Sequence, residues 1–256
     1  ANGSWITRQD VRNVFTMGSG GPTGRGGVKK NKFLTIKSGK IGPEIGIGHY
    51  MGNLYGEPVL ILKSCIGNRS LAWDLLPPGS PSYEFEDKDK KSKQMKTYVY
   101  AGYGQSPDRW EKGTQAKAIK WKAGVQYDGD IARAKNVLNN LDKYYPGAKS
   151  YEVAGFFWWQ GDKDRYNTGH AIKYEQNLVN LFKALRKDFI VETGIAYGAD
   201  VVLKYEERSS YVWLVYGYGN VDRWDGIRWY DPVFDRRHNV NLVVSQGIGR
   251  DQDWEV

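Results

Sequence analysis

The chain has few of the residues that build covalent or metal-bound frameworks. Its 256 residues include one cysteine, Cys65, and three histidines. A single cysteine excludes an intrachain disulfide and a cysteine metal cluster, so we expect no metal site. Because Cys65 follows the apolar run at residues 59–62, we expect it to be a buried structural thiol.

Long hydrophobic runs are also missing. No segment has the roughly 18 consecutive apolar residues that a membrane-spanning helix needs, so we expect no membrane span. The chain begins at Ala1 and shows no signal peptide, which fits a mature form or an excised part of a longer product. The sequence alone therefore leaves its compartment open.

Positive charge is in excess, yet the usual nucleic-acid motifs are missing. The formal net charge is +8 and the sequence pI is about 9.3, with lysine clusters near residues 29–32 and 88–96. No helix-turn-helix, zinc-finger or RRM pattern accompanies them, so we expect no nucleic-acid partner. A solvated surface, or an acidic partner such as a charged polysaccharide, explains the charge equally well.

Aromatic residues are plentiful. Aromatic side chains make up 14% of the chain, with 10 Trp and 18 Tyr. Both residue types combine a flat apolar face with a polar tip, which suits carbohydrate stacking and interfaces, and also a plain core.

The stretch at residues 151–165, YEVAGFFWWQGDKDR, organises the rest of the chain. A continuous apolar run over 153–159 is typical of a buried strand in a parallel sheet. Ligands bind just past the carboxyl ends of such strands, where Gln160, Asp162 and Asp164 stand. The alternative is a core strand that ends in a polar loop without chemistry.

The remaining pattern predicts an α/β fold. We expect a helix opening at Gly42 and Pro43, one over 131–145 capped by Asp128 or Asp130, and one over 174–188. Residues 77–97 suggest a surface insertion, and residues 98–128 an irregular aromatic segment. We expect strands at residues 11–16, 33–36, 59–62, 153–159, 201–205, 211–216 and 241–244.

Several motifs in order resemble one family. They are IGPEIGIG at 41–48, EPVLILKSCIGNRSLAWD at 57–74, LPPGS at 76–80, WWQGD at 158–162, NLVNL at 177–181 and LRKDF at 185–189. Together they resemble the sialate O-acetylesterase-like branch of the SGNH hydrolases, which includes carbohydrate acetylesterases. The resemblance covers roughly residues 5–190.

The resemblance implies a three-layer α/β/α fold with a parallel sheet, and removal of acetyl groups from sugars without a cofactor. Such a reaction needs a serine nucleophile, a histidine base, an acid that orients the histidine, and an oxyanion hole. By resemblance, Gly67 and Gln160 correspond to the oxyanion hole and Asp162 to the acidic position after Gln-Gly. We expect the neighbouring Asn68, Arg69 and Trp159 to bind substrate.

Two departures from the family put catalysis in doubt. The family nucleophile lies in a motif of the type Gly-Gln-Ser-Asn, upstream of the segments that match here. Ser19, in Gly-Ser-Gly, lacks a following helix pattern and is interpreted as a loop serine; Ser245 follows a strand but has only 11 residues after it.

The second departure concerns the base, because the family histidine lies near the C-terminus and residues 190–256 do not resemble the family. His49 lies inside a helix, and His170 heads one at a position that does not match. His238, with Asp235, has the Asp-x-x-His spacing used by many SGNH hydrolases, so this pair is the candidate base and its orienting acid.

Three functions remain open from the sequence. The first is a carbohydrate O-acetylesterase, related to enzymes acting on acetylated glycans, whose nucleophile segment is missing. The second is a non-catalytic module that binds polysaccharide or self-assembles through its C-terminal part, and the third, a basic nucleic-acid binder, ranks low. We expect an SGNH-like domain at 1–189 with a divergent, β-rich aromatic segment at 190–256 packed on it. Resemblance alone favours an extracellular or cell-surface location.

Overall fold

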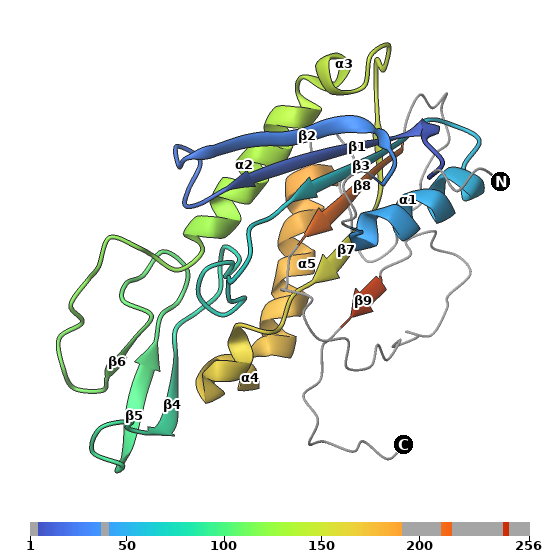
Figure 1. Cartoon of the computed structure of the whole chain (residues 1–256). Coiled ribbons are helices and arrows are strands. Elements are labelled where there is room, and N and C mark those ends of the chain that lie inside the picture. The colour runs from blue at the N-terminus through green and yellow to red at the C-terminus, as the bar shows by residue number, and fades with distance from the viewer. Residues whose placement is uncertain (1–4, 37–40, 191–210, 217–242, 246–256) are drawn as a thin grey trace, which may run out of the picture.

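The computed structural model describes residues 5–36, 41–190, 211–216 and 243–245, the last two segments as backbone (Figure 1). Six strands form one sheet in the order β2-β1-β3-β8-β7-β9. β2 is antiparallel to β1 at one edge, whereas all other neighbours are parallel. The strands are β1 (Arg8–Gly18), β2 (Gly26–Leu34), β3 (Val59–Ser64), β7 (Glu152–Trp159), β8 (Tyr211–Tyr216) and β9 (Val243–Ser245).

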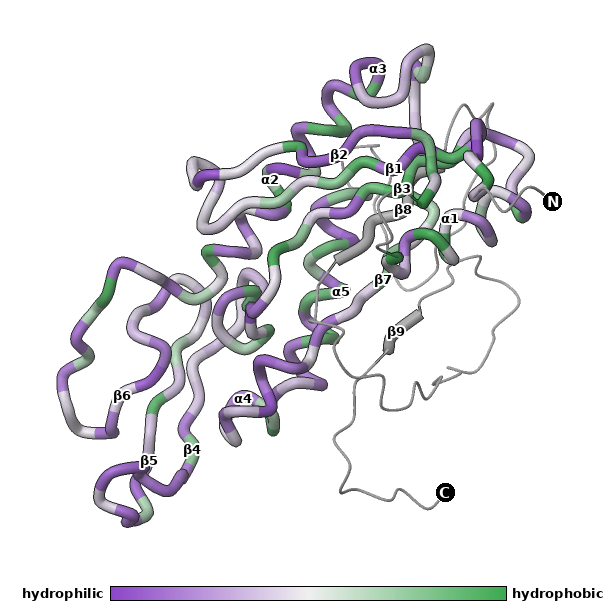
Figure 2. The backbone as a smooth tube through the Cα atoms, in the orientation of Figure 1, coloured by the Kyte–Doolittle hydropathy of each residue, from purple (hydrophilic) through white to green (hydrophobic). Residues whose placement is uncertain are grey.

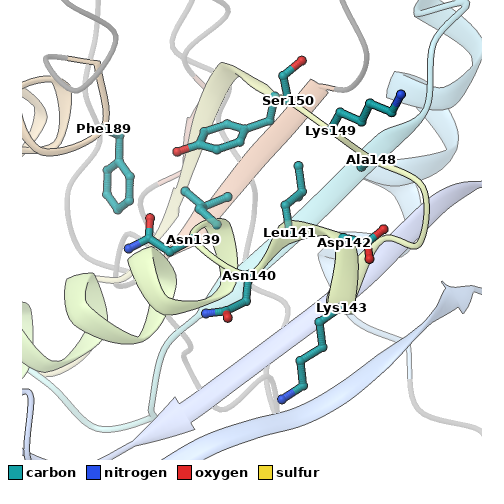
Figure 3. Close-up of a pocket in the computed structure, with 11 residues that line it drawn as sticks. Asn139, Asn140, Leu141, Asp142, Lys143, Ala148, Lys149, Ser150 and Phe189 are labelled. Atoms are coloured by element: carbon teal, nitrogen blue, oxygen red, sulfur yellow. The ribbon is translucent and has the colours of Figure 1, made fainter.

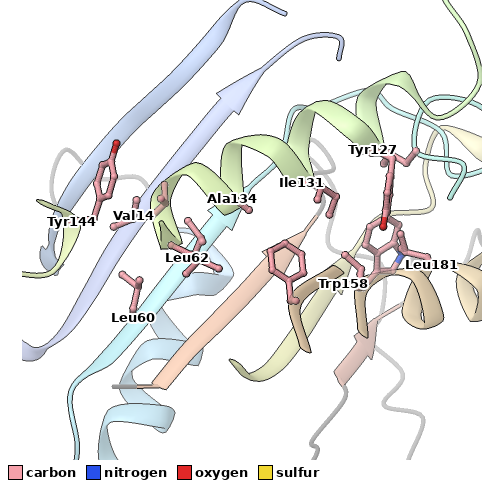
Figure 4. Packing of buried hydrophobic residues seen from close by; sticks show 14 of the residues in the cluster. Val14, Leu60, Leu62, Tyr127, Ile131, Ala134, Tyr144, Trp158 and Leu181 are labelled. Atoms are coloured by element: carbon pink, nitrogen blue, oxygen red, sulfur yellow. The ribbon is translucent and has the colours of Figure 1, made fainter. Parts of the chain in front are cut away.

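β3 shows why the sheet forms where it does. All six of its residues are buried, as expected for a strand covered on both faces. Side chains alternate along a strand, so Leu60 and Leu62 pack into one apolar cluster while Val59 and Ile61 pack into another. The first cluster also holds Trp158 of β7 and Val14 of β1 (Figure 4).

Helices cover both faces of this sheet. α1 (Pro43–Leu54) packs on the face of Val59 and Ile61 through Met51. α2 (Val125–Leu138), α3 (Leu141–Tyr144) and α5 (Tyr174–Ile190) contribute to the cluster on the opposite face. Helices on both faces of a mostly parallel sheet define the α/β class.

A second, smaller sheet lies apart from the first. It is antiparallel, in the order β4-β5-β6, and the turn joining its first two strands is strongly hydrophilic (Figure 2). Two short helices, η1 and α4, follow β7. The bounds are β4 (Tyr83–Lys88), β5 (Met95–Tyr100), β6 (Arg109–Glu111), η1 (Asp164–Tyr166) and α4 (Thr168–Ile172).

Most predicted elements in the described residues are confirmed. The predicted strands at 11–16, 59–62 and 153–159 lie within β1, β3 and β7, and that at 211–216 has the bounds of β8. The predicted strand at 201–205 lies outside the described residues. The boundary predicted at residue 189 stays a prediction, and β8, which follows it in sequence, lies inside the sheet.

Two predictions between residues 77 and 145 were wrong. The helix expected over 131–145 begins at Val125, after Gly124 in the left-handed conformation, so neither Asp128 nor Asp130 caps it. Asp130 is instead buried within α2 and pairs with Arg133 at 2.6 Å. The segment expected to be irregular, 98–128, contains the end of β5 and all of β6, and the insertion expected at 77–97 contains β4.

None of the described helices is both long enough and apolar enough to cross a membrane.

Candidate functional site

The carboxyl ends of β1, β3 and β7 lie at one edge of the sheet. Because these strands are parallel, the residues that follow them gather there. Ser19 follows β1, the loop containing Arg69 follows β3, and Gln160 follows β7. Hydrogen bonds connect the three segments.

Arg69 is the central link. Its Nη2 donates to Ser19 Oγ at 2.8 Å, and its Nε donates to Gln126 Oε1 at 3.4 Å. Its backbone oxygen accepts from Gln160 Nε2 at 2.8 Å. The guanidinium lies over the Trp121 ring, 4.9 Å from the centroid. One residue thus joins the ends of all three strands.

Gln126, from the first turn of α2, holds the turn that carries Ser19. It is fully buried, donates from Nε2 to Gly18 O at 2.9 Å, and accepts at Oε1 from Gly20 N at 3.0 Å. A Cβ atom at Gly129 of α2 would lie 1.9 Å from Gly20 O, so glycine is required there for the turn to approach the helix.

Gln160 and Asp164 form the buried support behind Arg69. Gln160 Nε2 donates to Asp164 Oδ2 at 2.6 Å, and Asp164 also accepts the backbone N–H groups of Leu71 and Ala72. Burial raises the pKa of the Asp164 carboxyl above its usual value, although these hydrogen bonds favour the charged form. Asp164, rather than Asp162, therefore holds the loop after β3.

A second carboxylate closes the same loop. Asp74 Oδ2 accepts from Ser70 N at 2.9 Å and from Ser70 Oγ at 3.1 Å. Burial raises the pKa of Asp74, and the nearby Arg69 charge partly opposes this shift. Residues 69–72 therefore have their backbone fixed at every position by a side chain.

The structure brings only some of the predicted site residues together. Gly67 and Asn68 lie in the loop after β3, with Asn68 exposed at a positive φ of 59°. Trp159 ends β7 and is half-buried. Asp162 is exposed and pairs with Arg165 at 2.9 Å, away from the hydrogen bonds that join Gln160 to Arg69. His238 and Asp235 lie outside the described residues.

The expected role of Gln160 as an oxyanion donor conflicts with the hydrogen bonds that its side chain already makes. Its amide nitrogen has two N–H groups, and these already donate to Arg69 O and Asp164 Oδ2. Its Oε1 is buried and accepts no hydrogen bond from the described residues. The role stays a prediction that requires one of these two hydrogen bonds to be exchanged for the substrate.

Two histidines lie in the described ranges, and neither forms a hydrogen bond to Ser19 there. His170 is buried in α4, and its Nε2 lies 2.8 Å from Asp108 Oδ1. His49 belongs to α1, on the face of the sheet away from α2. In the same ranges no group of three His, Cys, Asp or Glu side chains is arranged to hold a metal ion.

A hollow of about 850 Å³ lies elsewhere (Figure 3). It is lined by α3, by residues 148–151 just before β7, and by Phe189. Residues preceding β7 are at the amino end of that strand, opposite Gln160. The hollow therefore does not belong to the cluster around Arg69.

Sequence reasoning missed three contributors to this cluster. Gln126 and Trp121 stand in the segment interpreted as irregular, where no periodicity marked them. Ser19 was interpreted as a loop serine because no helix follows it, and the structure places it directly after a strand of the parallel sheet. A strand ending at Gly18 was the signal that could have singled it out.

Comparison with known proteins finds a similarity to a family of carbohydrate esterases. Residues 80–197 match the model of the family described as carbohydrate esterase, sialic acid-specific acetylesterase. The match confirms the predicted resemblance over this stretch, which includes Gln160 and Asp164 and stops short of Ser19 and Arg69. No curated protein and no solved structure matched the chain.

Proposed function

We propose that this chain is an SGNH-like, carbohydrate-esterase-related domain that binds a glycan at the carboxyl edge of its sheet and is catalytically incomplete within residues 1–256. The family match and the helices on both sheet faces support a three-layer SGNH-like arrangement. The site would comprise Ser19, Arg69 and the loop after β3, with Gly67, Asn68 and Trp159 at its rim.

The bonding of Ser19 carries this proposal. A serine becomes a nucleophile when a base takes its proton, and the usual base is histidine. Here the partner of the Ser19 hydroxyl is the Arg69 guanidinium, which is always protonated and cannot accept a proton. Neither histidine of the described residues bonds to Ser19. Without its base, a triad keeps only residual catalysis from the oxyanion hole and substrate binding.

A second candidate is an active carbohydrate O-acetylesterase with Ser19 as nucleophile. The position of Ser19 at the end of a parallel strand favours it, since reactive groups of α/β enzymes stand at such ends. This candidate requires His238, oriented by Asp235, to reach the Ser19 hydroxyl in place of Arg69.

Hydrolysis of p-nitrophenyl acetate and of acetylated xylan by the purified chain separates the two candidates. We expect no turnover above the buffer rate, and no difference between the wild type and Ser19→Ala. Turnover that a serine-directed inhibitor abolishes, and that Ser19→Ala and His238→Ala both remove, would establish the esterase instead. Glycan binding is measured separately, by calorimetry with unmodified oligosaccharides.

Assembly through residues 190–256 stays a prediction of its own. Aromatic residues are enriched in that segment, and aromatic anchors often carry the binding energy of interfaces. Light scattering of the intact chain over a range of concentrations tests it. A mass that stays at one chain up to high concentration would exclude assembly.

A further inference from the structure

Arg69 carries a positive charge that forms no ion pair with the described residues, although the buried Asp74 carboxylate lies near enough for the Arg69 charge to act on its pKa. Within the described ranges, no carboxylate forms an ion pair with it, and its two side-chain hydrogen bonds go to the neutral groups of Ser19 and Gln126. A guanidinium has five N–H groups, so three have no protein partner in those ranges. Arg69 is half-buried, which leaves it open to a ligand while limiting screening by water.

The guanidinium is also held in place. The Trp121 ring supports one of its faces, and the Arg69 backbone is fixed by Gln160. The three residues that follow it are bonded through their N–H groups to Asp74 and Asp164. A planar cation fixed in this way loses little freedom on binding, and its fork of N–H groups matches the two oxygens of a carboxylate.

The surroundings are cationic as well. Lys120 and Lys122 flank Trp121 and are exposed, and Arg25, whose backbone oxygen accepts from Ser19 N at 3.0 Å, is exposed too. The acidic groups of the adjoining segments face other partners: Asp74 is buried against Ser70, and Asp128 accepts from the Tyr103 hydroxyl at 2.7 Å. Among the described residues, the exposed charges that flank Trp121 and the turn of Ser19 are therefore positive.

We propose that Arg69 is a specificity-determining residue that binds the carboxylate of a sugar, so that the site takes an acidic, uronic-acid-type glycan in preference to a neutral one. This rests on the proposed function, because it assumes that a glycan occupies the carboxyl edge of the sheet. Arg25, Lys120 and Lys122 would attract further carboxylates along the same polymer, and their contribution would weaken with salt.

The test uses a matched ligand pair at constant ionic strength. Trigalacturonic acid and its methyl ester share one sugar framework and differ in charge, and calorimetry gives both affinities for the full chain. We expect the wild type to prefer the acid by about tenfold or more, as for a charge-assisted hydrogen-bonded pair. Arg69→Gln should lose most of this preference and keep only the salt-sensitive part that the exposed cations supply. Arg69→Lys should keep more of it, since it keeps the charge and loses the fork.

Arg186→Gln is the matched control. Arg186 is exposed on α5 and undergoes the same change in charge, so its variant should keep the wild-type preference. Thermal melts identify any variant that fails to fold. If Arg69→Gln does not fold, the binding test uses Arg69→Lys instead. Equal binding of acid and ester by the wild type, or an unchanged preference in Arg69→Gln, would overturn the proposal. Competition by inorganic phosphate as strong as by galacturonic acid would also overturn it, because the site would then be a general anion site.

The outcomes keep the two proposals apart. If the inference alone fails, both forms of the trisaccharide bind with similar affinity. If neither form binds and neutral xylotriose does not bind either, the proposed glycan-binding function has failed.

Discussion

The two sheets of this protein differ in the contacts that hold their strands together. In the six-stranded sheet, β3 is buried at every residue and its side chains pack into apolar clusters on both faces. In the small sheet, β4 alternates between half-buried and exposed residues, and ion pairs such as Arg109–Asp87 and Lys96–Glu111 link the strands. Dehydration of apolar surface therefore stabilises the first sheet, whereas in the second such polar contacts add to the stacking of Tyr83 on the buried Tyr100.

The largest expected effect comes from the apolar sheet. Leu62→Ala removes a fully buried side chain from the cluster that joins β3 to α2 and α5, and should lower the free energy of unfolding by about 2–5 kcal/mol. Urea unfolding followed by circular dichroism measures it. Leu54→Ala, at the exposed end of α1, should change stability by no more than about 0.5 kcal/mol. Similar losses in both variants would contradict the view that burial dominates here.

The sequence predicted the apolar sheet far better than the small one, and the reason is physical. A run such as residues 59–62 is apolar at every position, so burial follows from composition alone. In the small sheet, Asp87 of β4 pairs with Arg109 of β6, 22 residues away, and no local pattern predicts such a pair. The same holds for the candidate site. Gln160 and Arg69 lie in motifs that the sequence shows, whereas Gln126 and Trp121 reach the site only through the fold, so no local pattern predicted them.

An intermediate effect on stability is expected for Asp164, the buried carboxyl behind Arg69. Asp164 accepts three hydrogen bonds, and Asp164→Asn replaces one acceptor oxygen by a donor, which should lower the free energy of unfolding by about 1–3 kcal/mol at neutral pH. The loss of stability in Asp164→Asn should grow as the pH is lowered. Burial raises the pKa of Asp164, so the folded state binds the proton more tightly than the unfolded chain.

The raised pKa of Asp164 fixes the direction in which stability changes with pH. The contribution of Asp164 to stability is fully present below the unfolded-state pKa of an aspartate, and is lost as the pH rises through the raised folded-state pKa. Unfolding measured from pH 4 to pH 7 should show this slope in the wild type and in exposed Asp162→Asn, and a shallower slope in Asp164→Asn, where the raised pKa values of Asp74 and Asp128 remain. Equal slopes in all three proteins would mean that the carboxyl titrates normally.

The smallest effects on stability are expected in the small sheet, where they should depend on how exposed the substituted ion pair is. Arg109 Nη1 donates to Asp87 at 2.7 Å and to the Tyr100 hydroxyl at 2.6 Å, so Arg109→Gln should cost about 1–2 kcal/mol. Lys112 pairs with Glu84 while both side chains are at least half exposed, and Lys112→Gln should change stability by less than about 0.5 kcal/mol.

Hydrogen exchange locates this difference within the small sheet. Amides of β5 should exchange faster in Arg109→Gln and at the wild-type rate in Lys112→Gln, while amides of β3 should be unchanged in both. Faster exchange throughout the six-stranded sheet would show that the two sheets unfold as one unit and would remove the distinction between them.

The position of β8 has a consequence for the order in which the protein is made. β3 and β7 are separated in the sheet by a strand, residues 211–216, that the ribosome synthesises after both of them. Until that strand emerges, each of the two presents an unpaired edge, a site where nascent chains can pair wrongly with one another. The sheet can therefore close only late in translation, and slow translation between residues 190 and 211 would lengthen the period in which a chaperone is needed.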